Sequence, residues 1–466
     1  MRLILILTAL LAFQSAAASE FDETKALAEQ GVAAAQNSLG KMYTNGRGVP
    51  ENAAEAVKWY RKAAEQGYVN AQFNLGLMYE IGKGAPENDT EAVKWYRKAA
   101  EQGNADAQNS LGKMYTNGHG VPKNFAEAIK WYKKAAEQGY AIGQINLGIM
   151  YANGYGMPEN DTEAVKWFKK AAKQGHVNAQ FNLGTMYYYG EGVPKNVAEA
   201  VKWYRKAAEK GYVNAQRLLG IMYSIGDGIP ENDAEAIKWF KKAADQGLAN
   251  AQYNLGDMYN KGEGVPENDA EAVKWYRKAA DQGYADAQYN LGVYYQHGVS
   301  MPENDAEAVK WFRKAAEQGL APAQYNLGLM YASGEGVPEN DAEAVKWVRK
   351  SADQGAPYAQ HQLGWMYENG EGVPKNDTEA FNWYARAAAQ GNERAQYNLG
   401  LMYATGSGML KSKIRAYVWW SMSKIQGTLR AQSALDILKP RMNAQQIVQA
   451  QALATKCYES NYKDCD

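Results

Sequence analysis

Cysteine is almost absent from this 466-residue sequence: there are only two, Cys457 and Cys465, both within the last ten residues. So few cysteines exclude a small domain held together by many disulfides, and they also exclude a cysteine-rich metal site. In an oxidising compartment the two thiols can pair and close the end of the chain. The alternative is two unpaired thiols.

An excess of charge of either sign is also absent, since 51 Lys and Arg residues stand against 51 Asp and Glu residues. Net charge therefore gives no support to a nucleic-acid partner or to an anionic membrane surface. Apolar residues make up 46% of the chain and aromatic residues 12%. This is enough to build a core, so the chain is expected to fold.

Residue patterns that carry out catalysis are missing as well. The four histidines, at positions 119, 176, 297 and 361, show no metal-ligand spacing. The repeated Gly-x-Gly pairs lack the third glycine of a dinucleotide-binding loop, and no G-x-S-x-G or P-loop sequence occurs. We therefore predict no catalytic residue, no metal ion and no cofactor.

Long apolar runs are missing except at the start, where eleven residues from Leu3 to Phe13 follow the positive charge of Arg2. Small residues follow, up to Ala18. This pattern predicts a signal sequence over residues 1–18, cleaved after Ala18, and a protein that is periplasmic or secreted. A bilayer span needs roughly 20 residues, so no membrane insertion is expected.

What the sequence does contain is a repeat of 36 residues. The pair Leu-Gly recurs with this spacing from Leu39-Gly40 to Leu399-Gly400, and all but one of the 45 glycines, Gly143, fall into four columns of the repeat. Tryptophan follows the same spacing at positions 59, 95, 131, 167, 203, 239, 275, 311, 347, 383 and 419. One unit is therefore copied eleven times.

Each copy is predicted to form two helices, here called helix A and helix B. In the second copy Ala71, Leu75 and Met78 follow helical spacing and form the apolar face of a helix A. Gly84 supplies backbone freedom for a turn, and Pro86 prevents the helix from continuing.

Helix B of this copy is predicted to begin at about residue 89, with Asn88 as its cap. Glu91 stands three residues later, where a capping box would place it. Trp95 lies in the middle of the apolar stripe, so we interpret the recurring tryptophans as core. Gly103 ends the helix.

A single helical hairpin of this length cannot bury two apolar faces. We therefore predict an all-α fold in which eleven helix-turn-helix repeats stack into a right-handed α/α superhelical solenoid. The glycine of each Leu-Gly pair is disfavoured inside a helix. It is best explained by close approach of an adjacent helix.

The pattern Ala-Gln-x-x-Leu-Gly-x-Met-Tyr, followed by Gly-x-Gly-Val-Pro and Ala-x-x-Trp-Tyr, resembles the Sel-one-like repeat (SLR) family, a relative of the tetratricopeptide repeats. The resemblance implies paired antiparallel helices, a superhelix with helices A on its concave side, and a role in holding proteins together or docking on a partner. It does not imply an enzyme. Some secreted relatives carry a disulfide in every repeat, and this chain lacks those cysteines.

The resemblance also suggests how the chain is divided. Residues 19–34 match half a repeat and form an N-terminal cap, residues 35–427 form the eleven repeats, and residues 428–466 form a helical C-terminal cap with a possible disulfide. Departures from the pattern are local: Gly143 replaces an alanine, Tyr294 a methionine, Ser300 a glycine and Leu410 a proline.

Candidate binding residues are those that vary between copies on the side of helix A opposite its apolar stripe. In an SLR superhelix this side lines the concave groove, where rigid aromatic side chains would bind an extended or helical peptide. The candidates are Phe73, Leu77, Phe181, Tyr188, Arg217, Tyr253, Asp257, Tyr289, Tyr325, His361, Trp365 and Tyr397.

An alternative interpretation is that this aromatic column packs between adjacent helices A. Both interpretations stay open for the tyrosines, whereas the groove is favoured for His361 and Trp365. The outer face of helix B carries interleaved charges, such as Lys58 beside Glu55, and is interpreted as a solvated surface.

The main functional hypothesis is a secreted or periplasmic scaffold that binds a protein or peptide partner along the concave groove. Two alternatives remain: a structural spacer without a groove ligand, and a hydrolase acting on envelope peptide or glycan. Nucleic acid is not an expected partner. The sequence predicts neither the identity of the partner nor the oligomeric state.

Overall fold

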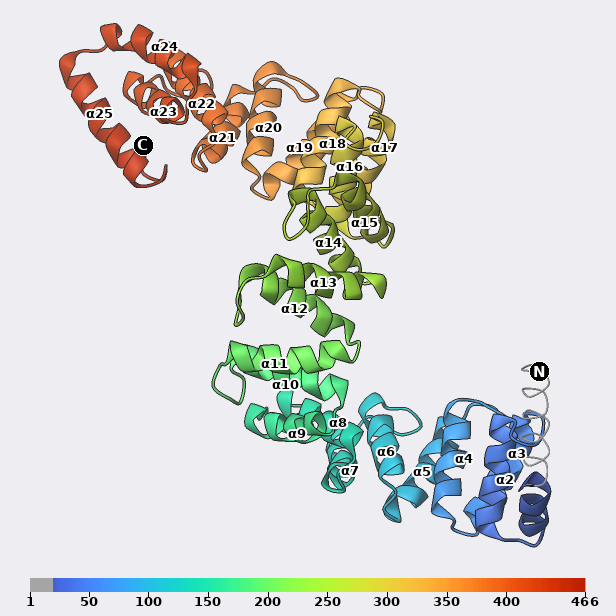
Figure 1. Cartoon of the computed structure of the whole chain (residues 1–466). Helices are drawn as coiled ribbons and strands as arrows, with labels where there is room; N and C mark the ends of the chain where they lie inside the picture. Colours follow the sequence, from blue (N-terminus) through green and yellow to red (C-terminus); the bar gives the residue numbers. More distant parts are fainter. Residues whose placement is uncertain (1–19, 466) are drawn as a thin grey trace. The chain divides into compact units, whose positions relative to one another are not determined.

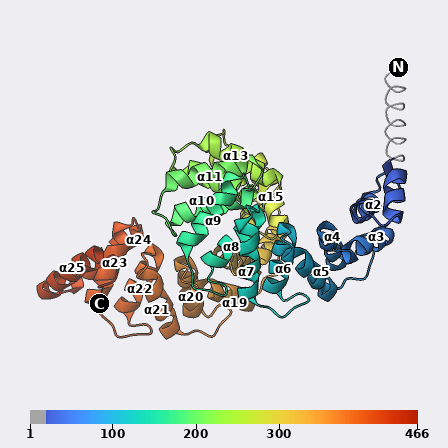
Figure 2. The same cartoon turned by 90° about the horizontal axis from the view of Figure 1, so that it is seen from below.

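The structure is a computed structural model that describes residues 20–465, and every regular element in that range is a helix (Figure 1). The signal sequence predicted for residues 1–18 lies outside the described residues. The chain divides into two compact units, Met1–Asn232 and Asp233–Asp466. Even-numbered labels from α2 to α24 are helices A, and odd-numbered labels from α3 to α23 are helices B (Figure 2).

In the first unit, residues 20–29 are helical and precede the repeats. The helices that follow are α2 (Ala33–Asn45), α3 (Ala53–Glu65), α4 (Val69–Glu80), α5 (Asp89–Glu101), α6 (Ala105–Asn117), α7 (Phe125–Glu137), α8 (Ala141–Ala152), α9 (Asp161–Lys173), α10 (Val177–Tyr189), α11 (Val197–Glu209) and α12 (Val213–Ile225). The first helix A thus begins at Ala33, two residues before the expected start of the array.

The second unit continues with the same alternation and ends in three further helical segments. Its elements are α13 (Asp233–Asp245), α14 (Ala249–Lys261), α15 (Asp269–Asp281), α16 (Ala285–His297), α17 (Asp305–Glu317), α18 (Ala321–Ser333), α19 (Asp341–Asp353), α20 (Pro357–Asn369), α21 (Asp377–Ala388), α22 (Glu393–Thr405), α23 (Lys413–Ile425), α24 (Leu429–Leu438), the 3₁₀ helix η1 (Lys439–Arg441) and α25 (Ala444–Glu459).

Inside each unit the hairpins stack in sequence order. A helix A packs against the helix B of its own repeat and against the helix B before it, as α4 does with α5 and α3. The predicted stripe of Ala71, Leu75 and Met78 is 0%, 0% and 3% exposed. The core therefore continues from one hairpin to the next, and the predicted α/α solenoid is confirmed.

The glycine of the Leu-Gly pair marks the point where the two helices of a repeat approach most closely. A Cβ atom on Gly76 would lie 2.7 Å from Cδ1 of the Tyr96 ring on α5, inside van der Waals contact. Equivalent glycines, such as Gly112 against Tyr132, show the same approach. The explanation of this glycine by close approach of a neighbouring helix is confirmed.

Helix B begins as predicted. Asn88 caps α5 by accepting a hydrogen bond from Glu91 N at 3.0 Å. The side chain of Glu91 does not complete a capping box, because its carboxylate binds Lys94 at 3.0 Å and Trp95 Nε1 at 3.2 Å. The second half of the motif was predicted wrongly, because an ion pair one turn further along the helix holds the glutamate.

The recurring tryptophans lie at the edge of the core. Trp95 and Trp203 are 4% and 8% exposed, while Trp59 and Trp167 are half-buried. A lysine ammonium one turn later covers the outer ring face, as Lys98 does at 4.4 Å from the Trp95 centroid.

A ladder of glutamines runs along each unit and joins one repeat to the next. Gln72 Nε2 donates to Ala64 O at 3.2 Å, and Gln72 Oε1 accepts from Gln102 Nε2 at 2.8 Å. Gln108 and Gln138 repeat the second bond at 2.7 Å. These buried amides are satisfied because the preceding repeat supplies the carbonyl acceptor and helix B of the same repeat supplies the donor.

The C-terminal segment covers the last hairpin. Helices α24 and α25 pack against α23, where Val418 and Trp420 are 0% and 5% exposed. Cys457 on α25 and Cys465 are joined by a disulfide.

Candidate functional site

The predicted binding residues occupy three positions on helix A, and Tyr188 alone holds the one nearest the end of the helix. Those at the third position of Ala-Gln-x are half-buried, and six of them pack a ring against the aromatic side chain of helix B in the same repeat. The ring centroids are 5.7 Å apart for Phe73–Tyr96, 5.5 Å for Phe181–Tyr204, 5.7 Å for Tyr253–Tyr276, 5.8 Å for Tyr289–Phe312, 5.5 Å for His361–Tyr384 and 6.5 Å for Tyr397–Trp420. This column therefore contributes both to packing and to the surface.

The position four residues later, one turn along helix A, is more exposed. Leu77 is 37% exposed and Trp365 is 40% exposed. Asp257 forms an ion pair with Lys261 at 2.6 Å. We call the surface formed by these outward side chains of successive helices A the helix A face.

In the first unit the candidates lie on separate helices A. Phe73 and Leu77 belong to α4, and Phe181 and Tyr188 to α10. The Tyr188 hydroxyl donates to Asp227 Oδ2 at 2.9 Å.

Arg217 on α12 stands where other repeats have an aromatic ring. Its Nε atom is buried and finds no hydrogen-bond partner within the described residues. Nothing in the first unit brings Arg217 to the candidates on α4.

In the second unit the candidates are spread over five helices A. Tyr253 is on α14, Tyr289 on α16, Tyr325 on α18, His361 and Trp365 on α20, and Tyr397 on α22. Burial, helped by the nearby Asp257 carboxylate, raises the pKa of Tyr253 to about 12. Three of these candidates, His361, Trp365 and Tyr397, lie together at one cavity.

That cavity has a volume of about 750 Å³ and lies between three successive helices A, α20, α22 and the start of α24. His361, Trp365 and Tyr397 line one part of it. The remaining lining residues were not predicted; they are Glu393, Arg394, Asn398, Gln426, Gly427, Thr428, Leu429 and Arg430. We call this the α20–α24 cavity.

His361 is held as a neutral imidazole in the wall of the cavity. Burial, and next the positive charge of Arg394, lower the pKa of His361 to about 4, against an opposing effect of Glu393. Asn398 Nδ2 lies 3.3 Å from His361 Nε2. Because an amide NH₂ group only donates, this ring nitrogen is the acceptor.

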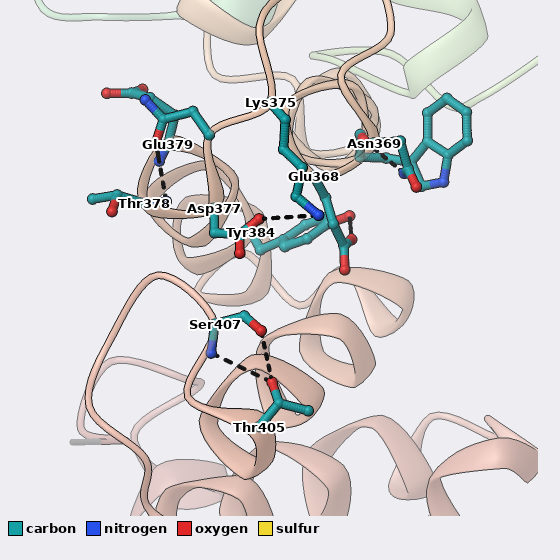
Figure 3. Close-up of polar contacts among 11 residues, drawn as sticks. Glu368, Asn369, Lys375, Asp377, Thr378, Glu379, Tyr384, Thr405 and Ser407 are labelled. Carbon is teal, nitrogen blue, oxygen red and sulfur yellow. Dashed lines mark hydrogen bonds and ion pairs between the residues drawn. The ribbon is translucent and has the colours of Figure 1, made fainter.

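Polar contacts of the same repeat fix Tyr384, the ring against which His361 packs; Figure 3 shows Tyr384 with Glu368 and Asn369. The Tyr384 hydroxyl donates to Glu368 Oε2 at 2.7 Å, and Asn369 Nδ2 donates to the backbone oxygen of Trp365 at 2.9 Å. Burial and this bond to a carboxylate raise the pKa of Tyr384. The ring under His361 is therefore a fixed support.

Two guanidinium groups give the cavity its charge. Among residues 20–465, Arg394 and Arg430 form no hydrogen bond and no ion pair, and both side chains are exposed. Glu393 is the one acidic lining residue. Leu429, which is 86% exposed, adds a second apolar side chain to the lining beside that of Trp365.

A signal for these arginines exists in the sequence. Both occupy the second residue of a helix A, a position that holds Ala34, Asn70 or Asp106 in the first copies and no basic residue in any earlier copy. Comparison of the copies at this column would have selected Arg394 and Arg430 directly.

Between residues 20 and 465 no three His, Cys, Asp or Glu side chains gather as a metal site would require. No helix in that range combines the length and the apolar character that a bilayer span requires.

The fold and this cavity define a class of protein: an α/α repeat solenoid whose variable residues lie on the surface of its helices A. The family comparison gives the particular repeat. The sequence model of the Sel1 repeat matches residues 33–68, 69–104, 105–140, 141–176, 177–212, 213–248, 249–284, 285–320, 321–355, 357–392 and 393–427. The chain belongs to the Sel1 repeat family, and the resemblance to Sel-one-like repeats is confirmed.

The solved structure of one SLR protein agrees with this assignment. The chain is 36% identical to c5321, a protective antigen present in uropathogenic Escherichia coli strains and displaying an SLR fold, with a TM-score of 0.84 over 95% of this chain and 96% of that one. It is 33% identical to a Sel1 repeat protein from Oxalobacter formigenes, with a TM-score of 0.47 over 52% of this chain and 96% of that one. A comparison with curated proteins gave no match.

Proposed function

We propose that this protein is a periplasmic or secreted scaffold that binds a protein partner through a peptide segment lying along the helix A face, the concave side expected for the repeat family. The observation that supports the proposal is the α20–α24 cavity, where His361, Trp365 and Tyr397 gather on adjacent repeats. Rigid aromatic side chains beside a polar rim are typical of interface hot spots.

The chemistry of the cavity selects an acidic segment. Arg394 and Arg430 leave two guanidinium groups without a carboxylate partner in the described chain, and Trp365 and Leu429 offer apolar surface beside them. A peptide with an Asp or Glu next to an apolar residue satisfies both features. Neutral His361 adds no charge at neutral pH.

The proposal is tested by site-specific crosslinking in the native envelope or culture medium. A photoreactive phenylalanine analogue is placed at Trp365 and, as a matched control, at Val293, which holds the same repeat position on α16. The captured partner peptide is read by mass spectrometry. We expect capture at 365 of a segment that contains an acidic residue, and no capture of that segment at 293.

Charge reversal sharpens the result. The double variant Arg394→Glu/Arg430→Glu is expected to lower the crosslink yield from position 365 roughly tenfold. Lys424→Glu, an exposed charge change on α23, is the control and leaves the yield unchanged. Capture of a segment without acidic residues contradicts the acidic occupant, and failure to capture any protein supports a spacer without a groove ligand.

The location in the cell has its own test. N-terminal sequencing of the protein recovered from periplasm or medium should show cleavage after Ala18. Recovery of the chain with residues 1–18 attached from the cytoplasm would contradict it.

A further inference from the structure

In the first unit two successive helices B, α9 and α11, carry more basic than acidic side chains. Helix α9 carries Lys166, Lys169, Lys170 and Lys173 against two acidic residues, and α11 with its C-cap Lys210 carries four basic residues against two. The preceding helix B, α7, has three basic residues against two acidic ones, and α5 has three of each sign. Two adjacent helices B therefore hold an excess of positive charge that the neutral composition of the whole chain conceals.

Two substitutions in the repeat produce this excess. Lys173 stands at a position where Glu65, Glu101 and Glu137 stand in the earlier copies, and Lys210 stands where the other copies have glutamine. In α7 the pair Lys133–Glu137 lies 3.9 Å apart as an ion pair. At the same spacing α9 has Lys169 and Lys173, two like charges that repel each other.

These ammonium groups surround two cavities. One, of about 440 Å³, is lined by Lys173, Lys206 and Lys210 together with Glu209, Gln180, Ala172, Gly175 and Trp203. The other, of about 270 Å³, is lined by Lys166, Lys169, Lys170 and Lys173 together with Glu163 and Trp167. Lys173 lines both cavities, so one lysine connects the two basic linings.

A buried amide in the wall of the first cavity lacks its usual partner. In the other repeats the glutamine of helix A accepts from the glutamine of the next helix B, as Gln144 does from Gln174 at 2.9 Å. Lys210 replaces that donor and binds Gly175 O at 2.5 Å instead. Gln180, which is 4% exposed, is left with an Oε1 atom that has no partner in the described chain.

The imidazole next to this point is also affected. Burial, and then the charge of Lys210, lower the pKa of His176, and its buried Nδ1 atom has no partner among the described residues. An unpartnered buried acceptor carries a free-energy penalty, because it has lost its hydrogen bonds to water and gained none in the protein. A single Lys210→Gln substitution would remove this penalty, yet this copy has lysine at the position.

We propose that the surface formed by α9 and α11 binds an acidic saccharide, a polyhydroxylated ring that carries sulfate, phosphate or carboxylate groups. The lysine ammonium groups attract the anionic substituents. The Glu209 carboxylate, the Glu163 oxygen that Lys166 does not bind and the free oxygen of Gln180 accept hydrogen bonds from sugar hydroxyls. The first cavity has a volume within the range of about 300–1,000 Å³ found for small-ligand sites.

The acidic lining residues favour this ligand over other polyanions. A phosphodiester backbone or a layer of lipid phosphates has few hydroxyl donors to offer, so Glu163 and Glu209 would repel it. A saccharide brings donors and negative charge on the same ring. This surface is separate from the α20–α24 cavity, and the proposal does not depend on the peptide partner.

The test measures binding of the full chain to a heparin-derived octasaccharide by titration calorimetry. The variant Lys173→Glu/Lys210→Gln restores the residues of the other repeats, so it is expected to fold at least as well as the wild type. We expect its affinity for the octasaccharide to be at least about tenfold lower than that of the wild type. The control Lys98→Glu/Lys134→Gln makes the same charge change on α5 and α7, and it should keep the wild-type affinity.

Further probes assign the ligand class. An oligogalacturonate that binds distinguishes carboxylate-bearing from sulfated saccharides, and a neutral dextran oligosaccharide should not bind. Absence of binding by both acidic saccharides overturns the proposal, as does equal loss in the control variant. Duplex DNA or phosphatidylglycerol vesicles that bind as tightly as the octasaccharide, and lose affinity in the same variant, would also overturn it in favour of a general polyanion surface.

Discussion

At the scale of single residues, the same repeat position holds different side chains in successive copies. The residues around each side chain determine its properties. The third position of Ala-Gln-x holds Tyr325 on α18 and His361 on α20, each packed on its own helix B. The charge of Arg394 acts on both side chains, and of the two only His361 has its pKa lowered into the acidic range, by burial and next by Arg394.

His361 is therefore expected to make stability depend on pH. Its pKa is lowered to about 4 in the folded chain, whereas an unfolded histidine titrates near about 6.5. The unfolded state binds more protons between these values, so stability is fully present above about pH 6.5 and falls, by up to about 3 kcal/mol, as the pH drops towards 4.

The measurement is an NMR titration of labelled histidine, with urea unfolding at pH 7 and pH 4.5. His361→Tyr, which installs the residue of position 325, should remove this part of the pH dependence. A titration midpoint for His361 above pH 6 would contradict the burial that we describe.

Lys210 is the second residue whose effect is set by a neighbour. Lys210→Gln restores a donor to Gln180 Oε1 and should stabilise α10 and α11 by about 1 kcal/mol. Gln174→Lys removes the equivalent bond to Gln144 and should destabilise α8 and α9 by a similar amount. Hydrogen exchange of these helices measures both. Equal protection in wild type and Lys210→Gln would show that the unpartnered oxygen has no energetic effect.

At the scale of elements, the helices B are started by an asparagine, or by Ser412 in α23, and a glycine follows the end of each. Asn268 accepts from Glu271 N at 3.0 Å at the start of α15, and the same bond recurs at Asn304 in α17. Helix boundaries of this kind depend only on nearby residues, which is why the start of α5 at Asp89 was predictable from sequence.

Removal of one cap should loosen one hairpin. Asn268→Ala is expected to cost about 1 kcal/mol, because the N–H of Glu271 loses its acceptor. Hydrogen exchange in the first turn of α15 should increase while α19 stays protected. Ala270→Ser, an exposed change two residues later, serves as the control, and equal exchange in both variants would argue against the capping role.

Elements also explain which charges matter. In α5 the bases are matched by acids, with Lys94 bound to Glu91 at 3.0 Å, and a solvated surface describes it correctly. In α9 the substitution at Lys173 breaks that match. The interpretation of helix B as a neutral solvated surface therefore does not describe α9 and α11. One changed residue at each of these two helices altered the local charge.

At the scale of the whole molecule, the ends of the stacked hairpins need cover. In the second unit α23 buries Val418, Trp420 and Met422, which are 0%, 5% and 1% exposed. Helices α24 and α25 supply that cover. Repeat arrays depend on such terminal elements, because each hairpin is stable only against a neighbour.

Deletion of residues 428–466 should expose this apolar surface. We expect α22 and α23 to lose hydrogen-exchange protection and the truncated protein to associate, seen as a larger mass by light scattering after size exclusion. The full-length variant Cys457→Ser/Cys465→Ser is the control, because it removes the disulfide and keeps the helices. A monomeric truncated protein with a fully protected α23 would show that the cap is dispensable.

The sequence by itself determined the 36-residue period, the type and limits of the helices and their buried stripes. These depend on short-range spacing that eleven copies repeat, so any one copy predicts the others. The sequence also favoured a groove position for His361 and Trp365, while it left two interpretations open for the tyrosines.

Only the tertiary structure decided which departures from the pattern meet. Arg394 and Trp365, or Lys173 and Lys210, are about one repeat apart in sequence, and stacking of the hairpins places each pair around one cavity. The rotation between neighbouring hairpins and the side-chain packing at their contact set those distances. Neither quantity is contained in the spacing of residues along a single helix.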